Sequence, residues 1–233
     1  KEKSMRKKGL TVSRLRLMAR LAGMVMVTNL STGIIIMGIA FIIIFTASRQ
    51  WLPFFVLMGL GGGFMGIFLK LASYRVGRIE AWLNVETHPK GYQTRQSLYA
   101  IGSGGLFGRG YGKSIQKLAY IPEAHNDMIF SVICEEWGLL GAGIIAALFI
   151  FLIWRCLITA NSAPDISGAL LTMGVTAHLG LQMLINIAVV TNSIPNTGIP
   201  LPFISYGGTS LIFLMCEIGI VQNIAQQGKT YIS

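Results

Sequence analysis

The sequence predicts an all-α fold, a polytopic transmembrane helical bundle with one long loop outside the membrane. Of its 233 residues, 53% are hydrophobic and only 12% are charged, and the mean hydropathy is +0.62. Soluble domains carry roughly 25% charged residues, so this chain lacks the charge that a water-exposed surface needs. Apolar runs of about 20 residues, long enough to cross the hydrocarbon layer as helices, alternate with short connections and with one long polar segment, residues 73–127.

The apolar runs predict six spans in a single membrane domain that covers residues 1–233. These spans are residues 12–29, 30–48, 51–72, 128–154, 166–191 and 203–226. The first is the weakest, because Arg14, Arg16 and Arg20 lie in its first half and must extend their charged ends to the interface. The chain begins at Lys1 rather than at a methionine, and we expect it to be a fragment of a longer protein.

The distribution of charge predicts the orientation of the spans. Residues 1–20 contain eight Lys or Arg and one Glu, which is typical of a cytoplasmic segment next to anionic lipid. We therefore expect residues 1–11 to be cytoplasmic and residues 73–127 to be extracellular. No nucleic-acid partner is expected, because the basic segment lacks interleaved aromatic residues and any recognisable binding module.

The segment 73–127 is predicted to be a functional loop. Its 55 residues are many more than a connection between two helices needs, and loops of such length are usually functional or disordered. Trp82, Tyr92 and Tyr99 are among its many apolar residues, a composition that does not favour disorder. We expect the loop to fold back on the membrane surface and to be the catalytic part of the chain.

Two motifs in this loop suggest anion binding. Arg75 and Arg78 are three residues apart, so on a helix they share a face and can clamp a diphosphate with bidentate bonds; alternatively, they only extend to the membrane interface. The segment 102–112 has six glycines in eleven residues, which allow backbone N–H groups to surround an anion. A tightly packed turn is the alternative for this glycine-rich segment.

The end of the loop has the strongest catalytic pattern. Glu123, His125 and Asp127 fall within five residues, directly before an apolar span. The dipole of the following helix keeps an acid there ionised, whereas partial burial raises its basicity, so a carboxylate in this place can act as a general base. Alternatively, Asn126 or Asp127 only caps the helix. A metal site is not expected, because hard divalent cations need more oxygen ligands than this segment offers.

The later spans contain further acids, Glu135, Glu136 and Glu217. A charge at the bilayer centre costs about 3 kcal/mol on insertion scales, and we expect these acids to be paired or neutralised, by Arg155 or by a polar cavity, rather than catalytic. The segment 190–210 contains prolines that exclude a regular helix. Irregular backbone at membrane depth occurs only where it is buried in protein or lines a cavity, so we expect this segment to form the wall of a polar cavity beside the loop.

Four stretches together resemble the SEDS family of bacterial cell-wall proteins, the group of FtsW, RodA and SpoVE. They are YRVGRIEAWLN, GYQTRQSLYAIGSGGLFGRGYG, QKLAYIPEAHNDMIFSVICEEWGLLG and NTGIPLPFISYGGTS, in the family's order. The resemblance extends from about Asn29 onward and implies a fold of about ten spans, of which this chain holds roughly the last six. The last stretch is more similar to FtsW or SpoVE than to RodA, whereas Asn126 and Met128 replace a threonine and a phenylalanine of the family pattern.

The resemblance implies a peptidoglycan glycosyltransferase that polymerises lipid II on the outer face of the membrane. Asp127 matches the family's essential acid and would be the general base of an inverting substitution. We expect the diphosphate and the sugars to be bound by Arg75, Arg78, Arg109, Lys113, Lys117, Glu123, His125 and Ser205. The alternatives are a lipid II flippase, which would depend on Glu135, Glu136 or Glu217, and a non-catalytic division scaffold, which needs only surfaces.

The resemblance also implies the surroundings of this reaction. The expected partner is a class B penicillin-binding transpeptidase, and the expected location is the bacterial cytoplasmic membrane, crossed several times, including the membrane at the division septum. No cofactor bound by the protein alone is expected. A divalent cation, Mg²⁺ or Mn²⁺, held jointly by the protein and the substrate diphosphate is compatible with this expectation.

Overall fold

The structure, a computed structural model, describes residues 30–47, 59, 73–118 and 120–230. Its described part is helical and contains no β-strand, so the all-α prediction is confirmed. The helices are α2 (Leu30–Ala47), α4 (Ser73–Leu83), α5 (Tyr92–Gly104), α6 (Ile129–Asn161), α7 (Ile166–Val190) and α8 (Gly208–Thr230), with the short 3-10 helix η1 (Pro89–Gly91) before α5.

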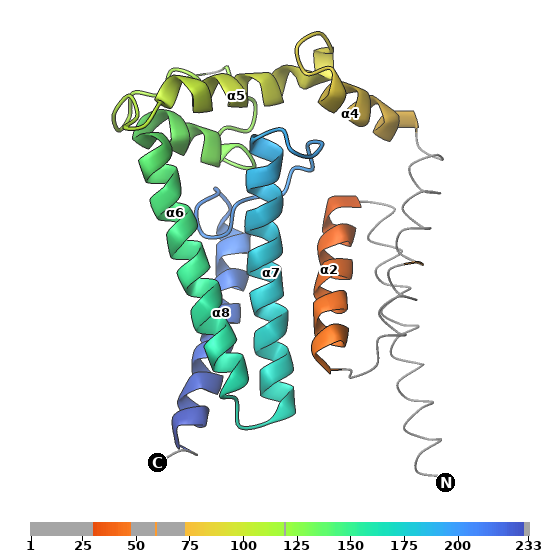
Figure 1. Ribbon diagram of the computed structural model, residues 1–233, viewed down its shortest axis with the longest axis vertical. Helices are drawn as coiled ribbons and strands as arrows, with labels where there is room; N and C mark the ends of the chain where they lie inside the picture. The colour runs from red at the N-terminus through yellow and green to blue at the C-terminus, as the bar shows by residue number, and fades with distance from the viewer. Residues whose placement is uncertain (1–29, 48–58, 60–72, 119, 231–233) are drawn as a thin grey trace.

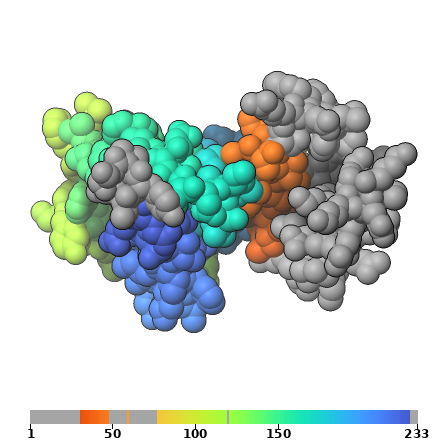
Figure 2. Space-filling view, turned by 90° about the horizontal axis from the view of Figure 1, so that it is seen from below, coloured from red at the N-terminus to blue at the C-terminus, as the bar shows by residue number. Residues whose placement is uncertain are grey.

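The helices form an upright bundle with a layer across one end. Figure 1 shows α6, α7 and α8 running up and down the molecule, with α2 beside α7, while α4 and α5 lie across the top. Figure 2, from the opposite end, shows α2 to one side of the lower ends of the bundle. The expected folding back of the 73–127 loop is therefore present as this layer, which we call the loop layer.

Three helices are long and apolar enough to cross a membrane, and they correspond to the last three predicted spans. These segments are Ile129–Asn161, Ile166–Val190 and Gly208–Gly228, while the apolar helix Ser31–Ala47 is shorter. The predicted spans 12–29 and 51–72 and the basic segment 1–11 lie outside the described residues. The described helices alone identify an integral membrane protein.

Two helix bounds differ from the predicted spans for local reasons. The helix α8 begins at Gly208 rather than at residue 203, because Phe203 has a positive φ of 62° and follows two prolines, so the chain turns here before it becomes helical. The helix α6 continues past residue 154 to Asn161. The next helix, α7, begins at Ile166 and is capped by Asp165, whose carboxylate accepts a hydrogen bond from Gly168 N at 3.1 Å.

The helix α6 is broken near its beginning. Gly138 has φ 68° and ψ −170°, and Figure 1 shows that the first turns of α6 belong to the loop layer, whereas the rest descends through the bundle. A Cβ atom at this position would lie 2.4 Å from both Gly108 N and Leu106 O. Only glycine combines this backbone conformation with such a close approach.

The glycine-rich segment replaces the helical hydrogen bonds that this break removes. Four backbone bonds between 2.9 and 3.1 Å connect the two segments: Arg109 N to Glu135 O, Gly110 N to Glu136 O, Leu139 N to Gly105 O and Leu140 N to Leu106 O. The segment 102–112 is thus a tightly packed partner of α6, as one of the two sequence interpretations expected. Because the first part of α6 directly follows Asp127, this packing also positions Asp127.

We predict that Gly138→Ala destabilises the fold by about 2 to 4 kcal/mol, because an L-residue at this φ is strained and its Cβ overlaps the backbone of residues 106–108. Thermal unfolding in detergent measures the effect. Gly143→Ala is the matched control, since a Cβ there has no neighbour within 4 Å and alanine favours the helix. Equal behaviour of the two variants would contradict the described break.

Candidate active site

Asp127 lies at the junction of two cavities. Its exposed fraction is 7%, and it follows the irregular segment 120–126 directly before α6. A cavity of about 730 Å³ and another of about 410 Å³ both include Asp127, Glu123 and Gly198 in their walls. The two acids therefore face both spaces, and a group bound in either cavity comes close to Asp127.

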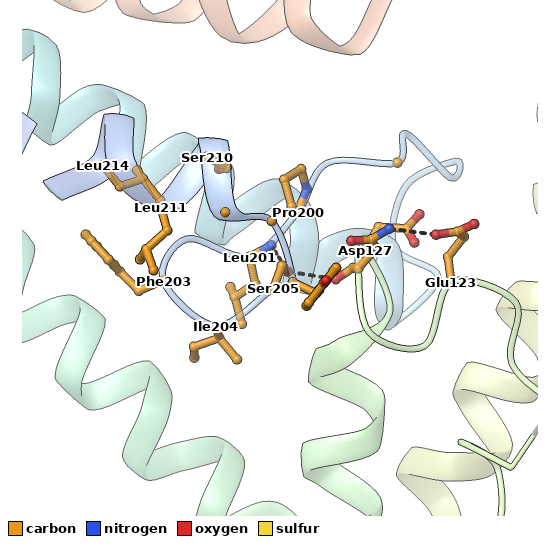
Figure 3. Close-up of a pocket in the computed structure, with 15 residues that line it drawn as sticks. Glu123, Asp127, Pro200, Leu201, Phe203, Ile204, Ser205, Ser210, Leu211 and Leu214 are labelled. Atoms are coloured by element: carbon orange, nitrogen blue, oxygen red, sulfur yellow. Dashed lines mark hydrogen bonds between the residues drawn. The ribbon is translucent and has the colours of Figure 1, made fainter. Parts of the chain in front are cut away.

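The larger cavity has a wall without cationic side chains. Figure 3 shows Asp127 and Glu123 at one end, opposite the segment that contains Pro200 and Ser205 and the first turn of α8 with Ser210. Tyr206, Gly207 and Gly208 also line it, together with apolar residues such as Leu211 and Leu214. The expectation that the segment 190–210 forms the wall of a cavity beside the loop is confirmed.

The smaller cavity is the cationic one. Arg78 of α4 and Lys90 of η1 line it with Gln93, Asn196 and the two acids. A Cβ atom at Gly77 would lie 3.2 Å from Lys90 Nζ, so this ammonium sits against α4 next to Arg78. Two cations on one wall, opposite a buried carboxylate, form a place where a phosphate group and a reacting hydroxyl can be bound near each other.

A chain of polar side chains connects the cation wall to the carboxylate. Arg78 Nη1 donates to the carbonyl of Asn196 at 3.1 Å, and Asn196 Nδ2 donates to Gln93 Oε1 at 3.0 Å. Gln93 Nε2 in turn donates to Asp127 Oδ1 over a long 3.5 Å. This series of hydrogen bonds joins α4, α5 and the connection between α7 and α8, so the positions of Arg78 and Asp127 depend on each other.

The backbone on both sides of Asp127 is fixed from α7 and from the 199–206 segment. Asn186, which is fully buried in α7, donates from Nδ2 to Asp127 O at 2.7 Å and to Ile199 O at 2.8 Å. Ser205 Oγ donates to Asn126 O at 2.7 Å, as Figure 3 shows. These bonds hold the backbone of Asp127 and the cavity wall against each other, and the position of the acid is preorganised as a result.

Glu123 adds a second carboxylate under backbone strain. Its φ is 57°, a conformation that is uncommon for residues other than glycine and is found most often at functional sites. Its carboxylate accepts a hydrogen bond from Asn126 Nδ2 at 2.6 Å. This turn places Glu123 in the walls of both cavities, close enough to Asp127 to act on its pKa.

Burial raises the pKa of Asp127 from the usual 3.8 to about 6. Loss of hydration is the largest cause, hydrogen bonding to the backbone lowers the pKa, the charge of Glu123 raises it, and the charge of Arg78 lowers it. A carboxylate with this pKa is ionised at neutral pH and is more basic than an exposed aspartate. This combination suits a general base that works near pH 7.

The alternative that Asn126 or Asp127 only caps α6 is wrong. The residue before the helix is Met128, and no side chain makes a capping hydrogen bond at this helix start. The Asn126 side chain donates to Glu123 instead, and the carboxylate of Asp127 faces the cavities. The acid is therefore available for chemistry.

Three of the predicted cations lie elsewhere in the described part of the chain. Arg109 Nη1 is 3.5 Å from Glu135 Oε1, and Lys117 Nζ is 2.5 Å from Glu136 Oε1. Lys113 is exposed on the same loop, and none of the three lines a cavity that contains Asp127. These positions do not support the expected role of the three residues in binding a diphosphate.

The glycine-rich loop does surround anions, but these anions are the protein's own carboxylates. The N–H groups of Gly112 and Ser114 donate to Glu136, and those of Ile115 and Gln116 donate to Glu135. The expectation that the two acids are paired is confirmed, whereas Arg155 as their partner is wrong, because their partners come from the loop layer. Glu217 of α8 pairs with His178 of α7 at 2.9 Å.

Of the remaining residues that were predicted to bind substrate, only some line the cavities. Arg78, Glu123 and Ser205 line the cavities with Asp127. His125 is exposed, and its backbone carbonyl, rather than its ring, holds the cavity wall by accepting from Tyr206 N at 2.8 Å. The side chain of Arg75 lies outside the described residues.

Sequence reasoning missed Lys90, Gln93 and Asn196. Each lies in a turn or at a helix start without charge clustering or periodicity around it, and they meet only because α4, α5 and the 190–198 segment pack together. No group of three or more His, Cys, Asp or Glu residues capable of holding a metal ion occurs among the described residues.

The fold and the site define a class: an integral membrane protein of the all-α type, with a buried carboxylate between a cationic and a neutral cavity at one end of the bundle. The chain belongs to the cell cycle protein family of FtsW, RodA and SpoVE, whose family model matches residues 1–230.

The curated relatives agree with the expected subgroup. Stage V sporulation protein E of Bacillus subtilis is 42% identical over 205 residues, which are 86% of this chain and 56% of that protein. A probable peptidoglycan glycosyltransferase FtsW of Coxiella burnetii is 42% identical over 190 residues, 79% of this chain and 51% of the relative. The chain thus spans about half the length of these relatives, and its similarity to FtsW and SpoVE is confirmed.

Solved structures share the fold. The structure described as "Structural coordination of polymerization and crosslinking by a peptidoglycan synthase complex" matches with a TM-score of 0.73 at 24% identity, covering 92% of this chain and 61% of the other. The rod shape determining protein RodA of Thermus thermophilus matches with a TM-score of 0.58 at 25% identity, covering 91% and 55%.

We predict that Asp127→Asn raises the free energy of unfolding at neutral pH by about 1 to 3 kcal/mol, because the variant no longer buries a charge. Since the pKa rises from 3.8 to about 6 on folding, the folded state binds the proton more tightly. The ionised carboxylate therefore lowers the free energy of unfolding by its full amount above about pH 6. This loss of stability disappears as the pH falls from about 6 to 3.8.

Thermal unfolding of both proteins at several pH values measures this difference. Asp165→Asn is the control, since Asp165 caps α7 and asparagine caps nearly as well as aspartate, so little change is expected. If Asp127→Asn is no more stable than the parent protein at pH 8, the carboxylate is not desolvated as described.

Proposed function

We propose that the protein is a peptidoglycan glycosyltransferase that polymerises lipid II, with Asp127 as the general base. The observation that carries this proposal is the position of one buried, basic carboxylate between a cationic cavity and a neutral one. Relatives that are named probable peptidoglycan glycosyltransferases support the reaction class. The hydroxyl groups of Ser205, Tyr206 and Ser210 in the otherwise mainly apolar wall of the larger cavity suit the polar groups of a sugar, and the cation wall suits a diphosphate.

In the proposed reaction, Asp127 takes the proton from the 4-hydroxyl of the acceptor N-acetylglucosamine. The hydroxyl oxygen forms a bond with C1 of the donor N-acetylmuramic acid, and the bond between C1 and the diphosphate oxygen breaks, with inversion at C1. Undecaprenyl diphosphate leaves with the electron pair. The proton remains on Asp127 and is returned to water before the next addition.

The cation wall would stabilise the leaving diphosphate. Negative charge grows on the diphosphate oxygens as the bond to C1 breaks, and positioned cations stabilise this charge electrostatically. Arg78 and Lys90 are the described cations that share a cavity with Asp127. We therefore assign the diphosphate to these two residues instead of Arg109, Lys113 and Lys117.

A divalent cation, Mg²⁺ or Mn²⁺, belongs to the proposal as a companion of the diphosphate. Asp127 and Glu123 line the same cavity and would supply carboxylate oxygen ligands, while the diphosphate and water would supply the others. When bound, such a cation would neutralise phosphate charge. The protein residues alone do not supply a complete site.

We also propose the cellular setting that follows from this activity. Lipid II is used on the outer face of the bacterial cytoplasmic membrane, so the loop layer would face outward, including at the division septum. A class B penicillin-binding transpeptidase is the proposed partner. The similarity to a solved complex that coordinates polymerization and crosslinking supports this pairing.

The structure favours the enzyme over the two alternatives. A flippase would need ionisable groups that move charge through the bundle, but Glu135 and Glu136 are bonded within the loop layer and Glu217 pairs with His178. A scaffold would have no reason to bury an aspartate with a raised pKa. We therefore retain only the glycosyltransferase as the proposed function.

We predict that Asp127→Asn in the full-length protein lowers the rate of lipid II polymerisation about 100- to 10,000-fold, because an amide cannot accept the proton. Glycan strands are separated on a gel after incubation of the purified protein, with its transpeptidase partner, and labelled lipid II. Asp165→Asn is the control that retains activity. Polymerisation at the parent rate by Asp127→Asn would exclude this carboxylate as the base.

We predict that Arg78→Ala and Lys90→Ala each lower kcat on the order of 10- to 100-fold, because each removes a cation from the diphosphate cavity. Lys113→Ala should change kcat little, since Lys113 lies on the glycine-rich loop outside this cavity. The comparison matches a lysine in the cavity with a lysine outside it. The opposite order would place the diphosphate at the glycine-rich loop instead.

A further inference from the structure

A large apolar surface surrounds the break in α6. Six exposed side chains form it, and we call it the tip patch: Leu106, Phe107, Tyr111, Trp137, Leu139 and Leu140. The two most exposed are Phe107 at 79% and Tyr111 at 84%. Soluble surfaces rarely expose so many large apolar side chains in one place, and such patches usually mark a protein or membrane contact.

The tip patch is one rigid surface rather than a set of separate side chains. Leu139 N and Leu140 N donate to the carbonyls of residues 105 and 106, so the loop and the helix break are joined through their backbones. The rings of Tyr111 and Trp137 meet edge to face with centroids 6.5 Å apart. The backbone that carries Phe107 and Tyr111 is therefore fixed by the fold, and the ring contact also orders the Tyr111 side chain, so placing this loop at a surface costs little further backbone entropy.

The tip patch continues the lipid-facing side of α6. Beyond Leu140, exposed apolar side chains follow at helical spacing along this span, at Ile144, Leu148 and Phe151. Figure 1 shows the loop after α5 at the end of the loop layer farthest from α2, beside the upper end of α6. The surface thus passes without a polar border from a membrane-crossing helix to the loop.

Cationic side chains stand beside the aromatic ones. Arg109 lies between Phe107 and Tyr111 in sequence, is 39% exposed and contacts Glu135 on its other side. Lys113 follows on the same loop and is exposed. Aromatic rings with Lys or Arg next to them are typical of segments at the boundary between acyl chains and headgroups, where each ring sits in the interface and each cation meets phosphate.

We propose that the loop 105–113 is a membrane anchor that inserts into the leaflet on the Asp127 side of the bilayer. Leu106, Phe107 and Tyr111 enter the boundary between acyl chains and headgroups, and Arg109 and Lys113 meet lipid phosphates. The anchor does not depend on the proposed enzymatic function. Because this loop is hydrogen-bonded to the first part of α6, the anchor fixes the depth of Asp127 relative to the membrane surface.

Site-directed spin labelling of the full-length protein in vesicles of phosphatidylcholine and phosphatidylglycerol tests this inference. Labels are placed by Phe107→Cys and, separately, by Tyr111→Cys, with the native cysteines replaced. Leu148→Cys, on the exposed face of the α6 span, is the lipid reference, and Glu86→Cys, exposed in the connection between α4 and η1, is the water reference. Collisions with oxygen and with a water-soluble nickel complex are measured at each label.

The anchor predicts a severalfold lower nickel collision rate at positions 107 and 111 than at position 86, with oxygen collisions nearer to those at position 148. Rates equal to those at position 86 would overturn the proposal. Protection that arises only after the transpeptidase partner is added would also overturn it, because the surface would then bind protein rather than lipid. The two labelled positions are independent, so one variant that fails to fold leaves the other decisive.

Discussion

The arrangement of this site depends on one constraint, the burial of the Asp127 carboxylate. The segment that carries Asp127 and the segment that forms the cavity wall are both bonded to one side chain, and this packing keeps the carboxylate out of water. Asn186 of α7 donates to the carbonyls of both Asp127 and Ile199, so the acid and the cavity wall cannot separate without losing a buried hydrogen bond. Removal from water raises the pKa of the carboxylate to about 6, and the same contacts place it between two cavities. Basicity and position therefore have a common structural cause.

The broken helix α6 supports this constraint from the other side. A continuous helix after Asp127 would have to enter the bundle at once, whereas the break at Gly138 allows the first turns to remain in the loop layer. The glycine-rich segment completes the missing hydrogen bonds and gathers Glu135 and Glu136. Glu135 and Glu136, which the sequence places within a predicted span, thus accept hydrogen bonds from backbone N–H groups. These bonds reduce the free-energy cost of burying the two carboxylates.

The sequence predicted the fold class and the last three spans, because apolar length is a local signal. It also singled out Asp127 from its clustered acids, and the catalytic role of this residue stays a prediction. It predicted Arg78 but not Lys90, since the two cations meet only through the packing of α4 on η1. It also assigned Arg109 and Lys117 to a substrate, although they pair with Glu135 and Glu136, which follow them by 26 and 19 residues. Charge type can be read from a sequence, but its partner depends on tertiary contacts.

The pH dependence of kcat/KM for lipid II polymerisation by the full-length protein tests the central claim most directly, because kcat/KM reports the free enzyme. If Asp127 acts as a general base with the pKa that its burial gives, kcat/KM should rise tenfold per pH unit at low pH and level off above an apparent pKa near 6. A mutation that removes the nearby negative charge, Glu123→Gln, should move this apparent pKa downward, since the charge of Glu123 raises it. A plateau that extends unchanged to pH 4 would contradict the account.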